Sequence, residues 1–395
     1  MPLLLPFEKI SEADLQLLCD QACPESQTLD FKRDLPGRLD QDKQEFAKDV
    51  AALANTDGGD IVFGVQEADG CAERLSLLSK ENADEAMRRL LQIIEAGIEP
   101  RLHVQIRHVE CTGGYALLVR VPRSFVGPHC IRVNAARRFV MRNGVKNVDL
   151  TFEQVRTAFD RTATLAERAR QFISHRRRLV ESHANAQPIR EGPILLMHLI
   201  PMAGLSGSSS INLSPLNQFQ TLQQFYNPSW HGGFDKSFNL DGLVVHSNPD
   251  RDHGSRGYCH LFRTGAVEFA ELGGHSNDAG MGLQKVIVSS EITRFYTESL
   301  NQGIGFLKVS GFSGPAVLGI SLLHTTDFEL VRRQPVRGAP KTDRPHLQLP
   351  ESWINELETV NIDETLRPLM DVVWQAFGLG ACTQYDPSGK YKPDP

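Results

Sequence analysis

Three residues near the N-terminus combine the side chains that phosphodiester chemistry requires. The segment alternates polar and apolar residues, which predicts a short strand over 28–33. On such a strand Asp30 and Lys32 project to the same side, while the residue between them points to the core. A carboxylate can hold a divalent cation, and an ammonium can stabilise charge that develops on a phosphate. Glu25 joins the pair only if the chain turns near Ser26, because it lies an odd number of positions before Asp30 and a straight strand would point it to the other face.

A third carboxylate is available after the next predicted strand. Residues 60–65 are apolar enough to be buried on both faces of a sheet, and Glu67 follows shortly after them. Strand ends are where open α/β sheets place functional groups. Glu25, Asp30 and Glu67 would form an all-oxygen site suited to Mg²⁺ or Mn²⁺. Asp69 is a rival third ligand, and the alternative interpretation is an ordinary solvated strand face beside a loop carboxylate.

Further helices and strands must position these residues. Phe46, Val50 and Leu53 recur at helical spacing and predict a helix over 43–55. That helix stops at the turn signal Asn55-Thr56-Asp57-Gly58-Gly59. This part of the chain also predicts helices at 11–23 and 81–97, strands at 101–109, 115–121 and 138–142, and two successive helices, one from Phe152 and one over 164–182. The mixture predicts an α/β (α+β) fold.

The remainder of the chain predicts a second, smaller α/β domain. The length of 395 residues favours two domains. Apolar segments such as 194–200 and 315–323 predict strands, and 287–302 predicts a helix. We therefore expect a first domain at 1–162 and a second at 194–345. A basic helix and linker at 163–193 would join them, and a C-terminal helix and tail would follow at 346–395.

Composition is typical of a soluble globular protein. Hydrophobic residues make up 41% of the chain and charged residues 23%. No apolar run approaches the ~18–20 residues that span a bilayer, and the N-terminus lacks the basic region of a signal peptide. The seven cysteines are scattered and form no CxxC pair. We expect a cytoplasmic protein with no membrane partner, no zinc knuckle and no disulfide framework.

Charge is distributed unevenly along the chain. Residues 1–100 hold 10 Lys/Arg and 21 Asp/Glu, whereas residues 101–180 hold 16 Lys/Arg and 5 Asp/Glu. The basic segment 101–180 of this acidic protein is a candidate nucleic-acid surface. Alternatively, the acidic segment 1–100 and the basic segment 101–180 could neutralise each other across one fold. The candidates for phosphate contact are Arg123, Arg138, Arg142, Lys146, Arg176 and Arg177. For the run 176–178, a solvated helix face is the alternative.

The order and spacing of several motifs resemble the Schlafen AlbA_2 domain family. The motifs are Glu25-Ser26-x-x-Leu29-Asp30-Phe31-Lys32, Ala51-Ala52-Leu53-Ala54-Asn55-Thr56-Asp57-Gly58-Gly59, Phe63-Gly64-Val65, Glu99-Pro100, Val121-Pro122-Arg123-Ser124 and Met141-Arg142-Asn143-Gly144. The resemblance extends over about residues 20 to 160 and implies an AlbA-like fold. The sequence departs from the family at Asp30, where glutamate is usual, and at Gln66-Glu67, where an acidic pair with aspartate is common.

The resemblance implies a metal-dependent endoribonuclease that acts on structured RNA such as transfer RNA. In the family, the active site uses two glutamates around the EFK segment and an acidic residue after the GV strand. By position these fall on Glu25, Asp30 and Glu67, with Lys32 beside them. Mg²⁺ or Mn²⁺ would be the cofactor. A role in bacterial defence follows by family analogy alone.

Two other hypotheses remain open. The chain could be a non-catalytic nucleic-acid-binding regulator, since proteins with this domain are also described as DNA- or ATP-binding. The sequence contains no G-x-x-x-x-G-K-[ST] phosphate loop. Alternatively, the second domain could be a sensor or oligomerisation module that controls the first. The chain could also form a homodimer.

Overall fold

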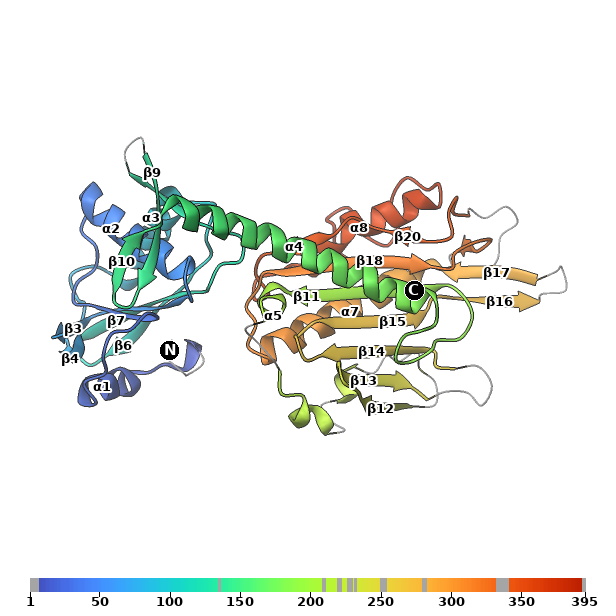
Figure 1. Ribbon diagram of the computed structural model, residues 1–395, viewed down its shortest axis with the longest axis horizontal. Helices are drawn as coiled ribbons and strands as arrows, with labels where there is room; N and C mark the ends of the chain where they lie inside the picture. Colours follow the sequence, from blue (N-terminus) through green and yellow to red (C-terminus); the bar gives the residue numbers. More distant parts are fainter. Residues whose placement is uncertain are drawn as a thin grey trace. The chain divides into compact units, whose positions relative to one another are not determined.

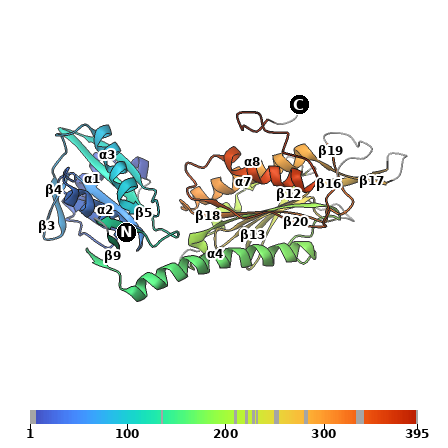
Figure 2. The same cartoon turned by 90° about the horizontal axis from the view of Figure 1, so that it is seen from above.

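The computed structural model describes residues 7–133, 136–207, 211–218, 222–225, 230, 233–248, 254–278, 283–331 and 341–392. The chain divides into two compact units, Met1–Thr164 and Leu165–Pro395 (Figures 1 and 2). Both contain helices and sheets, so the predicted mixed α/β class is confirmed. The second unit has more residues than the first and extends beyond the predicted bounds 194–345, because residues 165–193 and the C-terminal helix also belong to it.

Two four-stranded sheets and a hairpin form the first unit. The main sheet has the order β1-β2-β7-β6, in which β1 is parallel to β2 and the other neighbours are antiparallel. Its strands are β1 (Leu29–Lys32), β2 (Gly59–Phe63), β6 (Gln105–Cys111) and β7 (Gly114–Val121). The second sheet, ordered β10-β9-β8-β5, consists of β5 (Ile98–Glu99), β8 (Cys130–Val133), β9 (Ala136–Asn143) and β10 (Lys146–Asp149). The hairpin pairs β3 (Val65–Ala68) with β4 (Cys71–Leu75).

Helices cover both faces of the main sheet. On one face, α2 (Asp40–Ala54) and α3 (Ala83–Gly97) share a core with the main sheet and with β8 and β9. On the other face, α1 (Glu12–Asp20) and the β3–β4 hairpin form a second core; a 3₁₀ turn, Phe7–Lys9, precedes α1. The apolar stripe of α2 includes Phe46, which is buried as its spacing predicted. β1 therefore lies in a sheet that is packed on both sides.

One long helix, α4 (Phe152–Glu181), passes from the first unit into the second. The sequence predicted two helices here, and that prediction is wrong. Residues 160–164 contain no Gly or Pro that would end a helix, so the pattern continues without a break. In the second unit, α4 buries Leu165, Ala169 and Ile173, which recur every fourth residue on one face.

An eight-stranded sheet forms the centre of the second unit, with α4 on one face and α7 and α8 on the other (Figure 2). Its order is β12-β13-β14-β15-β11-β18-β20, with β21 also paired to β18 and every pair antiparallel. The sheet comprises β11 (Ile194–Pro201), β12 (Phe234–Phe238), β13 (Gly242–Ser247), β14 (Gly257–Phe262), β15 (Val267–Leu272), β18 (Ala316–Leu323), β20 (Leu347–Gln348) and β21 (Ser352–Ile354). A smaller sheet holds β16 (Gly274–Asp278), β17 (Leu283–Val288) and β19 (Glu329–Val331). The helices are α5 (Met202–Leu205), α7 (Ser289–Val309) and α8 (Ile362–Ala376), with 3₁₀ turns at Ser214–Asn217 and Gln223–Phe225.

Candidate nucleic-acid site

Strand β1 presents the two charged residues that the sequence singled out. Phe31 is buried in the core, and Asp30 and Lys32 project from the other face of the strand, as the alternation predicted. Asp30 is only 3% exposed. The Lys32 side chain keeps 38% of its surface exposed, and its Nζ lies 2.7 Å from Asp30 Oδ2. The strand thus sets a buried carboxylate beside a partly exposed lysine side chain.

A second cation neutralises Asp30 from the neighbouring sheet. Arg142 of β9 is 1% exposed, and its guanidinium donates to Asp30 Oδ1 at 2.8 Å and to the Ser26 carbonyl at 3.3 Å. The prediction that Arg142 contacts nucleic acid is therefore wrong. A buried carboxylate requires a buried partner, and Arg142 supplies it.

Glu25 reaches the same region because the chain turns before β1. The Ser26 N–H donates to the Leu29 carbonyl, and the Phe31 N–H donates to Glu25 Oε1 at 2.8 Å. Burial raises the pKa of Glu25, and repulsion from Asp30 and Glu67 raises it further. The hydrogen bond from Phe31 acts in the opposite direction and lowers this pKa. Asp30 and Glu67 therefore both lie within electrostatic reach of Glu25. Glu67 itself is exposed on β3.

The carboxylates suit a hard divalent cation in chemistry, but they do not form a complete site. Among the residues that the structure describes, no three His, Cys, Asp or Glu side chains form a group that could hold a metal ion. Both oxygens of Asp30 already face cations, at 2.7 and 2.8 Å. Glu25 and Glu67 are the residues whose oxygen donors could hold Mg²⁺ or Mn²⁺ here.

Asp49 of α2 completes the cluster, and it was not among the residues predicted from the sequence. Its Oδ2 lies 3.6 Å from Lys32 Nζ, and its Oδ1 accepts a hydrogen bond from Asn147 of β10 at 2.5 Å. Burial raises the pKa of Asp49 to about 6, with repulsion from Asp30 adding to the effect and Lys32 opposing it. Burial disfavours the charged form of Lys32, yet Asp49 and Asp30 outweigh it and raise the pKa of Lys32. Asp49 lies on the apolar stripe of its helix. A charged residue at such a position was the sequence feature that could have revealed it.

The Asn55–Gly59 turn is scaffolding for this cluster. Asn55 donates to the carbonyls of His129 and Val140 and accepts from the His129 N–H, which ties the end of α2 to β8 and β9. Gly58 has φ +73°, and a Cβ there would lie 2.6 Å from backbone atoms of Val121 and Arg123. The motif therefore fixes β9, and with it Arg142, against the site.

The remaining basic candidates differ in exposure. In the first unit, Arg138 is exposed and paired with Asp149, Lys146 is exposed, and the Arg123 side chain is 29% exposed and lies 3.5 Å from Asp57. These three are available to phosphate.

In the second unit, Arg176 is 6% exposed and makes two hydrogen bonds to Glu268 of β15, at 2.7 and 2.9 Å. The prediction that Arg176 binds nucleic acid is wrong, because it neutralises a buried carboxylate. Arg177 is 20% exposed and lies 3.9 Å from Glu181.

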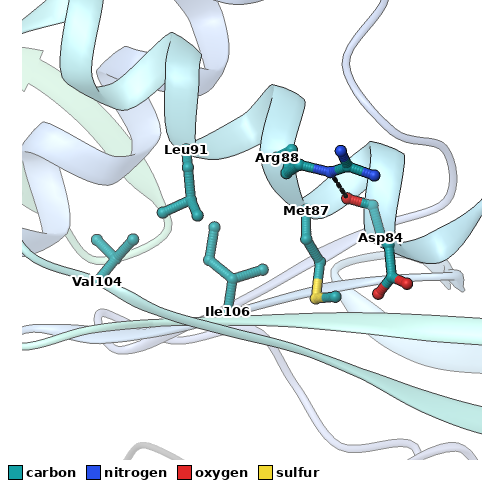
Figure 3. A pocket seen from close by; sticks show the side chains of 6 residues that line it. All are labelled: Asp84, Met87, Arg88, Leu91, Val104 and Ile106. Carbon is teal, nitrogen blue, oxygen red and sulfur yellow. Dashed lines mark hydrogen bonds between the residues drawn. The ribbon is translucent and has the colours of Figure 1, made fainter.

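A cavity of about 530 Å³ lies elsewhere in the first unit. It opens between α3 and β6, and Met87, Leu91, Val104 and Ile106 give it an apolar lining (Figure 3). The Arg88 side chain donates to the Asp84 carbonyl at its rim. None of the residues predicted for the site lines this cavity.

Among the described helices, none is long and apolar enough to cross a membrane.

Comparisons with known proteins find a family match within the first unit. The family model described as Schlafen, AlbA_2 matches residues 25–151. The N-terminal domain of a RecG-related protein from Nitrosomonas europaea is 21% identical, with 33% of this chain and 87% of that chain covered and a TM-score of 0.26. The DIP2311 protein from Corynebacterium diphtheriae is also 21% identical, with 35% of this chain and 26% of that chain covered and a TM-score of 0.24. No curated protein matches. Residues 25–151 thus match the Schlafen AlbA_2 family model, and they hold the whole cluster around Asp30 and Lys32.

Proposed function

We propose that the chain is a divalent-metal-dependent endoribonuclease that acts on structured RNA such as transfer RNA. The observation that carries the proposal is the ion pair between Asp30 and the partly exposed side chain of Lys32, next to Glu25, whose carboxyl group is repelled by Asp30 and Glu67. Burial and mutual repulsion raise the pKa of Glu25, a feature typical of functional carboxylates. The AlbA_2 family match supports the same assignment.

Each side chain has a distinct role in this proposal. Glu25 and Glu67 would hold Mg²⁺ or Mn²⁺, which when bound supplies positive charge at the scissile phosphate. Lys32 donates N–H groups to the phosphate oxygens from the exposed side of its ammonium. Asp30, which the sequence also offered as a metal ligand, forms an ion pair with Lys32 and accepts a hydrogen bond from Arg142, and so orients the lysine.

Basic residues of the same unit would hold the RNA. Arg123, Arg138 and Lys146 offer exposed charge for the phosphate backbone. Contacts of this kind fix position and give salt-dependent affinity without reading the sequence. Recognition of a folded RNA would then depend on its shape.

The test is cleavage of labelled transfer RNA by the full chain in the presence of Mg²⁺ or Mn²⁺. We expect Glu25→Gln to cut at least about 100-fold more slowly than wild type, because an essential charged group is lost. Glu73→Gln, an exposed acid on β4, is the matched control and should cleave normally. Equal rates for wild type and Glu25→Gln, or full activity in chelator, would remove the proposal.

A second candidate function is a nucleic-acid-binding regulator without catalysis. The ion pairs on both oxygens of Asp30 favour it, because they leave that carboxylate no place for a metal. It predicts RNA or DNA binding that weakens with salt, persists in chelator and is not followed by cleavage. Loss of binding on adding chelator would count against this candidate.

A further inference from the structure

The β9–β10 hairpin inserts two polar side chains into the cluster under Lys32. Arg142 and Asn147 are partners across the antiparallel pair, so their side chains lie on the same face of the hairpin. Arg142 donates to Asp30 and Asn147 donates to Asp49, at 2.8 and 2.5 Å. The two acids come from different elements, β1 and α2, and the hairpin engages both.

Lys32 forms ion pairs with both of these acids. Its Nζ lies 2.7 Å from Asp30 Oδ2 and 3.6 Å from Asp49 Oδ2. The side chains of Asp30 and Asp49 are 4% and 8% exposed, whereas that of Lys32 is 38% exposed. The cluster is therefore buried on its acidic side, and the lysine side chain that joins the two acids is partly exposed.

We propose that Asp49 and Asn147 are positioning residues that hold the ammonium of Lys32 in place at the phosphate site. The inference rests on the proposed function for its catalytic consequence. A lysine has a long, flexible stem, and one carboxylate alone leaves the ammonium free to swing. Two acids from separate elements fix it, and Asn147 fixes the second acid.

The location of Asp49 supports a role beyond stability. It lies on the buried stripe of α2, between Phe46 and Val50, where an apolar side chain would pack without desolvating a charge. Buried ion pairs contribute little net stability compared with apolar packing. Burial raises the pKa of Asp49, so the position is unfavourable for an acid. The contacts of Asp49 with Lys32 and Asn147 account for its presence there.

The first experiment reads the position of Lys32 without reference to cleavage. The full chain is treated briefly with an amine-acetylating reagent, and modification of Lys32 is measured by mass spectrometry against the exposed Lys80 as internal reference. We expect labelling of Lys32 to rise about threefold in Asp49→Asn, the scale of one half-exposed ion pair, and to rise in Asn147→Ala as well. The control Glu45→Gln, an exposed acid one turn earlier on α2, should label Lys32 as wild type does.

The second experiment measures transfer RNA cleavage by the same variants with Mg²⁺. We expect kcat to fall about tenfold in Asp49→Asn with KM unchanged, because the lysine acts in the transition state. Unchanged Lys32 labelling in both Asp49→Asn and Asn147→Ala would overturn the inference, as would a change in KM alone. If the variants label faster but wild type does not cleave RNA, the proposed function fails while the positioning of Lys32 stands. Asn147→Ala keeps the test decisive if Asp49→Asn does not fold.

Discussion

Replacing Arg176 with methionine should destabilise the second unit and leave RNA binding intact. The Arg176 guanidinium makes two hydrogen bonds to the buried Glu268, which also accepts from His198 at 2.9 Å and from Tyr258 at 2.8 Å. Burial alone would raise the pKa of Glu268, but Arg176 and His198 outweigh it and hold that pKa well below the usual range. Methionine preserves the apolar stem and removes the charge that neutralises Glu268.

The size of the effect follows from the burial of this pair. Removing one partner of a buried ion pair costs about 3–5 kcal/mol. For a unit of more than 200 residues, each kcal/mol lowers Tm by about 2–4 °C, so the second unit should unfold about 10 °C lower. Replacing Glu268 with leucine in the same chain should recover part of this loss, because no buried charge remains.

Calorimetry of the full chain measures the unfolding transition of the second unit, and fluorescence anisotropy measures RNA affinity. Arg178→Met is the matched control, since Arg178 is exposed in the last turn of the same helix. A Tm for Arg176→Met equal to that of the control, or a loss of RNA affinity specific to Arg176→Met, would refute the structural role.

Three further predictions concern the first unit. Gly58→Ala should destabilise it by about 2–3 kcal/mol in denaturant titration, because a Cβ there would meet backbone atoms. The control is Gly70→Ala, which should cost about 1 kcal/mol, because Gly70 also has a positive φ, +74°, but has nothing within 4 Å of its Cβ position. Equal losses in the two variants would contradict the steric argument. Because the pKa of Asp49 is raised to about 6 in the folded chain, the unfolded chain loses this proton first as pH rises from about 4 to 6. Stability relative to Asp49→Asn should therefore fall by up to about 3 kcal/mol across that window and stay level above it, and a flat difference between pH 4 and 7 would rule this out. Lys146→Gln should lower the slope of log RNA affinity against log salt by about 1; an unchanged slope would show that Lys146 does not contact phosphate.

The sequence predicted the local geometry around β1 correctly. Alternation alone placed Asp30 and Lys32 on one face of a strand, and the condition set for Glu25, a turn near Ser26, is met. Such features depend on neighbours in the chain, so the period of the pattern reveals them. The identification of the AlbA_2 domain depended on motif order, which the family match confirms.

The predictions for arginines failed where distant segments meet. Arg142 and Arg176 looked like surface cations, and each proved to neutralise a buried acid far away in sequence, Asp30 and Glu268. Composition counts charges but does not show which of them lose water on folding. The long α4 was missed for a different reason, since a helix pattern without a stop signal was divided in two.

The sequence by itself determined which side chains could do chemistry and on which face of β1 they lie, because backbone periodicity follows from covalent geometry. Only the tertiary structure decided which charges face one another. It brought Asp49, Arg142 and Asn147 to Lys32 and Asp30, and so left Asp30 occupied by cations. The physical reason is that pairing of buried charges depends on separations of a few ångströms between segments that are remote in sequence, and no local pattern encodes those distances.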